Sequence, residues 1–177
     1  MFLSVVTRCY RRPAMLEANK ASLEAQTDPD YEHIFLVDDE GAGMLEANRR
    51  LAKANPKGEY VLVLDDDDRL ADPEAIAALK EAATPDDPAL VIFRADHASR
   101  GILPDSRVWQ KRPAHGHIGS CDFITRRDWW ERHIHAFGAP EGGDYRFLWA
   151  MWMDMPTVVW LDRQLAAVQR ISRGAPG

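Results

Sequence analysis

The chain has 177 residues, of which 46% are hydrophobic and 28% are charged, and its formal net charge is -6. This length and composition predict one soluble globular domain around a single core. The negative charge argues against indiscriminate nucleic-acid binding, so we expect no nucleic acid among the partners. No apolar run is long enough to span a bilayer, and the N-terminus lacks the basic region of a signal peptide. Cys9 and Cys121 lie far apart in the sequence and in no metal-binding spacing, so we expect reduced thiols in a cytoplasmic protein, with a disulfide as the alternative that no pattern supports.

The first half of the sequence alternates between strands and helices. Apolar runs predict three buried strands, at residues 2–7, 33–37 and 60–64. Helical patterns fill the two intervals between them, at residues 13–27 and 44–54. This alternation predicts right-handed crossovers and a parallel sheet.

The second half of the sequence is less regular. Its predicted helices begin at Asp72, as a capping residue, at Asp128 and at Glu141. Its predicted strands cover residues 90–93, 120–125, 158–161 and 165–168. Between them, residues 94–119 show no periodic pattern, and a long irregular loop in a compact domain is usually functional or disordered.

Four aspartates, Asp65 to Asp68, directly follow the apolar run at residues 60–64. Ligands of open α/β sheets bind outside the carboxyl ends of the strands, so we expect these carboxylates to face a crevice. Adjacent like charges repel one another, and a cation would offset that cost. Hard oxygen ligands suit Mg²⁺ or Mn²⁺, with substrate phosphates completing the shell, so the run predicts metal-assisted phosphate-ester chemistry. The alternative is a solvated acidic turn before the next helix.

Taken in order, these segments resemble the family-2 glycosyltransferases of the GT-A fold, which move a sugar from a nucleotide-sugar donor to an acceptor. The segments that carry the resemblance are Ser4 to Pro13, Ser22 to Thr27, Ile34 to Asp39, Asn48, and Gly58 to Asp68. The resemblance covers roughly residues 2 to 160. It implies one α/β domain over residues 1–177, with a mixed, mostly parallel sheet flanked by helices. A nucleotide-binding half would cover about residues 1–95 and an acceptor half about 96–170.

The resemblance also implies roles for individual residues. Asp65 and Asp67 match the Asp-x-Asp pair that binds Mn²⁺ or Mg²⁺, and Asp67 would be the direct ligand of a metal that stabilises the leaving diphosphate. Asp144 matches the acid that deprotonates the hydroxyl of a glycan, lipid or protein acceptor, which would make the enzyme inverting. The implied donor-binding residues are Thr7, Arg8, Tyr10, Asp38, Asp39 and Asp66.

Some of these residues have a structural alternative. Asp38, Asp39 and Asp144 could each cap a turn or a helix. His117 lies in the irregular loop and is predicted as a further metal ligand through a neutral imidazole, whereas the alternative is an exposed loop histidine.

Other protein classes share part of the pattern. A phosphohydrolase of the haloacid dehalogenase type also places Asp-x-Asp after a strand, but Arg69 stands where that family has Thr or Val. A response-regulator receiver needs a lysine after a later strand, and the sequence offers no candidate. The segment Val37 to Gly41 departs from the usual glycosyltransferase continuation. This departure keeps open a degenerate module that binds a nucleotide or sugar without turnover.

Overall fold

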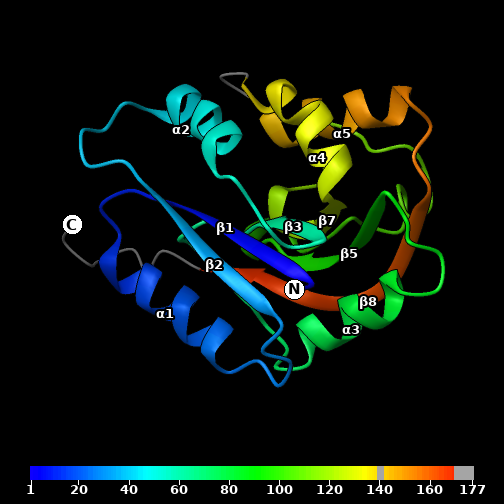
Figure 1. The fold of residues 1–177 in the computed structure, drawn as a ribbon, viewed down its shortest axis with the longest axis horizontal. Helices are drawn as coiled ribbons and strands as arrows, with labels where there is room; N and C mark the ends of the chain where they lie inside the picture. The colour runs from blue at the N-terminus through cyan, green and yellow to red at the C-terminus, as the bar shows by residue number, and fades with distance from the viewer. Residues whose placement is uncertain (139–141, 170–177) are drawn as a thin grey trace.

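The structure, a computed structural model, describes residues 1–138 and 142–169. An eight-stranded sheet lies at its centre, with helices on both faces (Figure 1). The strands are β1 Leu3–Cys9, β2 Tyr31–Val37, β3 Tyr60–Val63, β4 Asp68–Leu70, β5 Leu90–Asp96, β6 Ile102–Leu103, β7 Phe123–Arg126 and β8 Val158–Val168. The α-helices are α1 Pro13–Glu24, α2 Met44–Arg50, α3 Ala75–Ala83, α4 Arg127–His133 and α5 Gly143–Met153. The predicted helix start at Glu141 lies outside the described residues.

Each face of the sheet has its own hydrophobic core. In Figure 1, α1 and α3 cover the lower face, and α2, α4 and α5 cover the upper face. The central strand β3 contributes to both cores, because Leu62 packs toward α1 and α3 whereas Val61 and Val63 pack toward α4 and α5. This burial on both faces is what the uninterrupted apolar run of β3 predicts.

The strand order is β2-β1-β3-β7-β5-β8-β4, with β6 paired to β5. β1 is parallel to β2 and β3, and β5 is parallel to β8, whereas β7 is antiparallel to both β3 and β5. β7 could run parallel to β5 only if the chain first crossed back over the sheet, usually through an α-helix. No α-helix lies between β5 and β7. The mixed, mostly parallel α/β class is therefore confirmed: the alternating first half supplies the parallel strands β1, β2 and β3, and the antiparallel β7 makes the sheet mixed.

Several predicted elements differ in detail from the structure. β2 is an edge strand, not a fully buried one, and its Phe35 and Val37 side chains are 40% and 53% exposed. Residues 158–168 form one strand instead of two, because the pairing with β5 continues across a register shift after Phe93. β5 itself runs on to Asp96, into the segment predicted to be a loop.

The remaining differences concern where elements begin and end. α3 begins at Ala75, after a turn in which the Asp72 carboxylate accepts a hydrogen bond from the Glu74 amide. The predicted strand at residues 120–125 begins at Phe123, because residues 120–122 form a 3₁₀ turn. No helix in the described part of the chain combines the length and apolar character needed to cross a lipid bilayer. The cytoplasmic location stays a prediction.

The parallel pairing of β1 with β2 and β3 brings three loops to one edge of the sheet. The Asp38 amide donates to the Cys9 carbonyl at 2.9 Å, and the Asp66 amide donates to the Arg8 carbonyl at 3.2 Å. The loops that follow β1, β2 and β3 therefore lie side by side at the carboxyl ends of these strands, where α/β sheets bind their ligands.

Candidate functional site

Two neighbouring cavities open at this edge of the sheet. The first cavity, of about 350 Å³, is lined by residues that include Asp65, Asp68 and Asp144. The second cavity, of about 400 Å³, is lined by residues that include Tyr10 and Asp38. Arg8, Met44 and Asp65 line both cavities and form a shared wall.

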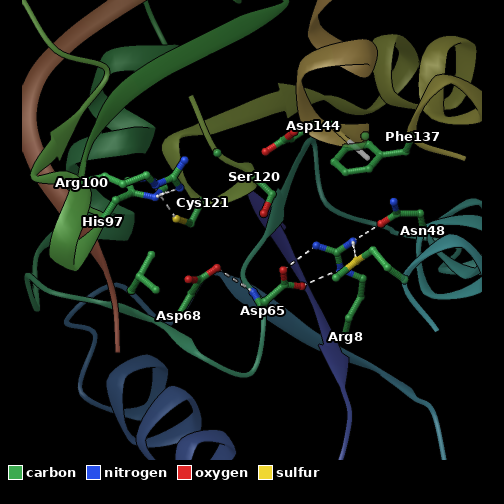
Figure 2. A pocket seen from close by; sticks show the side chains of 15 residues that line it. Arg8, Asn48, Asp65, Asp68, His97, Arg100, Ser120, Cys121, Phe137 and Asp144 are labelled. Atoms are coloured by element: carbon green, nitrogen blue, oxygen red, sulfur yellow. Dashed lines mark hydrogen bonds and ion pairs between the residues drawn. The ribbon is translucent and has the colours of Figure 1, made fainter. Parts of the chain in front are cut away.

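Arg8 is the main polar element of this shared wall (Figure 2). Its Nε donates to Asp65 Oδ1 at 2.6 Å, its Nη2 pairs with the other oxygen of the same carboxylate, and its Nη1 contacts Asn48 Oδ1. Burial lowers the pKa of Arg8, but the charge and hydrogen bonds of Asp65 outweigh that effect and leave the pKa raised. A bidentate pair of this kind fixes the guanidinium plane, so Arg8 is held rigidly between the two cavities.

The loop after β3 gathers three carboxylates. Asp65, Asp67 and Asp68 each offer an oxygen within 4.8 Å of the others. Asp67 forms an ion pair with Arg12, whereas the buried Asp68 accepts a hydrogen bond from the Asp65 amide at 3.1 Å. Burial, followed by the charges of Asp65 and Asp67, raises the pKa of Asp68 well above its usual range. This set of hard oxygen donors, whose mutual repulsion Arg8 and Arg12 offset only in part, fits a divalent cation, and it adds Asp68 to the predicted ligands Asp65 and Asp67.

Asp66 lines neither cavity. Its side chain is 1% exposed, accepts a hydrogen bond from the Tyr10 amide at 2.9 Å, and pairs with Arg12. The structure therefore places Asp66, predicted as a donor-binding residue, beneath the loop after β1, where it anchors Tyr10.

The position of the acidic loop depends on the buried Asn19 of α1. The Asn19 amide Nδ2 donates to the carbonyl oxygens of Asp65 and Asp68, both at 3.0 Å, and lies 3.4 Å from the Leu64 oxygen. The Asn19 side chain thus holds both ends of the turn that carries Asp65 to Asp68.

Replacing Asn19 with leucine should destabilise the protein. The change leaves buried carbonyl oxygens without their donor, which typically costs about 1–3 kcal/mol. In a domain of this size each kcal/mol lowers the melting temperature by roughly 2–4 °C, which thermal denaturation measures. The control is Glu17→Leu, at a position of α1 that is 72% exposed. Equal melting temperatures for the two variants would contradict the supporting role of Asn19.

The second cavity is shaped by the loop after β2. Asp38 Oδ1 accepts hydrogen bonds from the amides of Gly41 and Ala42 at 3.0 and 3.2 Å, and these bonds lower the pKa of Asp38. A Cβ at Gly41, where φ is +75°, would lie 2.7 Å from the Tyr10 hydroxyl oxygen, so the Tyr10 ring packs closely over this glycine. Asp38 and Tyr10 line the second cavity, whereas the exposed Asp39 lines neither cavity.

Asp144 lies in the first turn of α5 and faces the first cavity. It is not the capping residue, because Gly142 occupies that position, and its Oδ1 accepts a hydrogen bond from the neighbouring Tyr145 amide at 2.7 Å. Burial raises the pKa of Asp144, although the Tyr145 amide and the charge of Arg8 oppose this effect. A carboxylate at a cavity wall with a raised pKa is suited to accept a proton.

Besides Asp67 of the carboxylate cluster, two other predicted site residues line neither cavity. The Thr7 hydroxyl donates to the Leu64 carbonyl at 2.8 Å and lies 2.8 Å from His33 Nε2, so Thr7 joins neighbouring strands. His117 Nδ1 lies 3.5 Å from Asp105 Oδ2, and His117 is not part of the carboxylate cluster. Neither residue lines the first or the second cavity.

Sequence reasoning missed several residues that form or support these cavities. They are Arg12, Asn19, Asn48, Asp68, His97, Arg100, Ser120 and Phe137. Two carried a usable signal, because Asn19 and Asn48 are polar residues at buried positions of otherwise amphipathic helices. Asp68 belongs to the run of four acids, and the others come from loops and the ends of short helices with no local pattern to mark them.

Comparison with solved structures identifies the architecture. TarS from S. aureus, residues 1–349 in complex with UDP-GlcNAc, superposes with a TM-score of 0.74 at 14% identity, covering 97% of this chain and 59% of TarS. The chain has the GT-A glycosyltransferase fold. It spans about 61% of the TarS fragment solved with UDP.

Two other structures share this fold. PcManGT, a mannosyltransferase from Pyrobaculum calidifontis solved with GDP-Man and Mn²⁺, has a TM-score of 0.65 at 16% identity, covering 97% of this chain and 58% of its own. A glycosyltransferase involved in glycosylation of the major capsid of PBCV-1 has a TM-score of 0.62 at 11% identity, covering 99% of this chain and 95% of its own. Scans of the sequence against protein-family models and curated proteins give no match.

Proposed function

We propose that this chain transfers a sugar from a nucleotide diphosphate donor to an acceptor hydroxyl, with Mn²⁺ or Mg²⁺ as cofactor and inversion at the sugar carbon. The observation that carries the proposal is that Asp144 shares a cavity with Asp65 and Asp68, and that this cavity shares a wall with the second cavity. A proton acceptor and a diphosphate-binding cluster thus lie within reach of one bound donor.

In this proposal the nucleoside occupies the second cavity. The ring of Tyr10 offers an apolar surface there, and Asp38 offers a carboxylate to the base or ribose. The diphosphate lies at the shared wall beside Arg8, and the sugar extends into the first cavity. The TarS complexes with UDP and UDP-GlcNAc support a donor of this class. All the residues lining the second cavity fall within the predicted nucleotide-binding half, residues 1–95.

The carboxylates of Asp65, Asp67 and Asp68 would hold the metal ion. When bound, the ion supplies positive charge that stabilises the leaving diphosphate, a contribution of several kcal/mol. The Mn²⁺ in the PcManGT structure supports this choice of cofactor. Arg8 keeps Asp65 in place through its bidentate pair, so the carboxylate cluster is already oriented before the donor arrives.

Asp144 acts as the general base of the proposed reaction. It accepts the proton of the acceptor hydroxyl as the oxygen attacks the sugar carbon, while the bond from that carbon to the diphosphate breaks on the opposite side. Attack opposite the leaving group inverts the configuration. The ring of Phe137, which lines the same cavity and lies 6.0 Å from the Arg8 guanidinium, provides an apolar wall that limits access of water.

A specific observation favours a second candidate, a module that binds the donor without metal or turnover. Asp65 and Asp67 already form ion pairs with Arg8 and Arg12. These guanidinium groups offset two of the charges that would otherwise attract a metal ion. The dependence of donor binding on metal separates the two candidates.

The deciding experiment is a thermal-shift measurement with UDP and GDP, each with and without Mn²⁺. A ligand at about 100 times its dissociation constant stabilises the native state by roughly 2.7 kcal/mol, which corresponds to several degrees for a chain of this size. We expect one nucleotide to raise the melting temperature only when Mn²⁺ is present. An equal shift without metal would favour the binding module, and no shift with either nucleotide would overturn the proposed donor class.

A further inference from the structure

One more cationic side chain lines the first cavity. Arg100 ends the short 3₁₀ helix at residues 98–100, directly after β5. Figure 2 shows Arg100 and His97 on the wall opposite Arg8, with Asp144 between the two sides. Arg100 therefore approaches the first cavity from the side away from the second cavity.

A chain of hydrogen bonds, buried from His97 inward, holds the exposed Arg100. Its Nη2 lies 2.8 Å from His97 Nδ1, which must be the acceptor because a guanidinium only donates. The ring proton is then on Nε2, which donates to Asp122 Oδ1 at 2.7 Å. Asp122 Oδ2 in turn accepts a hydrogen bond from the Gly119 amide at 2.7 Å. The negative charge of Asp122 is thereby linked through a neutral imidazole to the positive charge of Arg100.

The surroundings fix this arrangement tightly. The side chains of His97 and Asp122 are only 3% and 0% exposed. A Cβ at Gly119 would lie 2.6 Å from His97 Cε1, so a larger residue there would displace the imidazole. A buried ion is costly unless it is paired and hydrogen-bonded, and burial leaves the pKa of Asp122 raised although His97 and the Gly119 amide both donate hydrogen bonds to it. The hydrogen bond to His97 ties one guanidinium nitrogen of the exposed Arg100 to the cavity wall.

The charge of Arg100 is not matched by a direct carboxylate partner. Arg8 and Arg12 form ion pairs with acids of the loop after β3, but within residues 1–138 and 142–169 no carboxylate forms one with Arg100. One Arg100 donor is used by His97, which leaves further N–H groups in a planar fork for a ligand. Such a fork matches the oxygens of a phosphate or carboxylate. The hydroxyl-bearing Ser120 lines the same cavity.

We propose that Arg100, positioned by His97 and Asp122, binds a phosphate or carboxylate group carried by the acceptor. The assignment to the acceptor rests on the proposed function, which places the donor diphosphate beside Arg8, across the cavity from Arg100. Asp144 lies between the two arginines, so a hydroxyl activated by Asp144 and an anionic group bound by Arg100 belong to the same incoming molecule.

The test measures binding of inorganic phosphate to the full chain by isothermal titration calorimetry, at constant ionic strength and with UDP present. Replacing Arg100 with glutamine should weaken phosphate binding about tenfold or more, as expected for loss of a charge-assisted hydrogen bond. Arg100→Lys should recover part of the affinity, because it restores the charge but not the fork. The control is Arg107→Gln, which removes an equal charge from a side chain that is 77% exposed and lines neither cavity. Unchanged binding in Arg100→Gln, or equal weakening in the control, would overturn the proposal.

Further probes identify the source of the anionic group. Glycerol 3-phosphate and glucuronate, titrated separately, distinguish a phosphate from a carboxylate on the acceptor, and we expect one of them to depend on Arg100. If Arg100→Gln instead weakened UDP-glucuronate but not UDP-glucose, the anion would belong to the donor and the acceptor assignment would be wrong. Phosphate can also be titrated without UDP. If the wild type did not bind UDP, that result would contradict the proposed donor binding, whereas phosphate binding by Arg100 would still be tested by the titration without UDP.

The positioning role of His97 has its own test. His97→Phe keeps an aromatic ring, slightly larger than the imidazole, but removes the acceptor for Arg100, so phosphate binding should fall toward that of Arg100→Gln. Adding Arg100→Gln to His97→Phe should then cause little further loss, because both changes remove the same interaction. Additive losses would show that His97 acts independently of Arg100.

Discussion

Replacement of Asp144 with asparagine should reduce sugar transfer by about 100- to 10,000-fold, the usual contribution of a general base. The amide keeps the size of the side chain and an acceptor for the Tyr145 amide, but it cannot take up a proton. Nucleotide binding should be retained, because Asp144 does not line the second cavity. The measurement is the initial rate of UDP or GDP release in the presence of acceptor, together with the thermal shift by the nucleotide.

The control for this change is Asp128→Asn. Asp128 occupies the same position in the first turn of α4, but it lies outside both cavities. Full transfer by Asp144→Asn, or an equal loss in both variants, would exclude Asp144 as the base. The pH profile adds a second readout, because a base must lose its proton before it can act. Since burial raises the pKa of Asp144, the rate should increase with pH through a range above the ordinary aspartate value.

Replacement of Asp68 with asparagine should stabilise the metal-free protein and weaken its response to Mn²⁺. Burial and the charges of Asp65 and Asp67 raise the folded-state pKa of Asp68, so ionised Asp68 costs stability. This cost is absent below the unfolded-state pKa and grows as the pH rises above it. Relief of about 1 kcal/mol would raise the melting temperature by roughly 2–4 °C at neutral pH. The affinity for Mn²⁺ should fall roughly 10- to 100-fold or more, because the carboxylate is a proposed ligand.

The control for Asp68 is Asp86→Asn, the same chemical change at an exposed position. Thermal denaturation at a series of pH values from acidic to neutral, with and without Mn²⁺, measures both the change in stability and the change in the response to Mn²⁺. The difference in melting temperature between Asp68→Asn and wild type should increase with pH when metal is absent. A variant that is less stable than wild type at neutral pH, or one with an unchanged Mn²⁺ response, would remove Asp68 from the proposed metal site.

Local sequence patterns predicted those parts of the fold in which the burial of a strand or helix follows from the residues of that strand or helix alone. The apolar run of β3 indicated a strand buried on both faces, and its two sets of side chains do contact different cores. The parallel pairing of β1, β2 and β3 followed from their alternation with helices, whereas the direction of β7 depends on the path of residues 97–122, which have no periodicity. The two predicted C-terminal strands are one because pairing with β5 carries the chain through an otherwise strand-breaking stretch.

The residues alone show that four acids follow a central strand and that an acid lies near the start of a late helix, because both features are local. Which of these acids face a cavity depends on how the strands and helices pack. The Asp66 carboxylate contacts Tyr10 and Arg12, whereas Asp68 lines the first cavity. Asn19 of α1 holds the loop that carries both acids. These contacts join residues 46 to 56 positions apart, so no local pattern encodes them. Side-chain direction in a tight turn is set by such long-range hydrogen bonds and ion pairs, which form only when the strands and helices have packed.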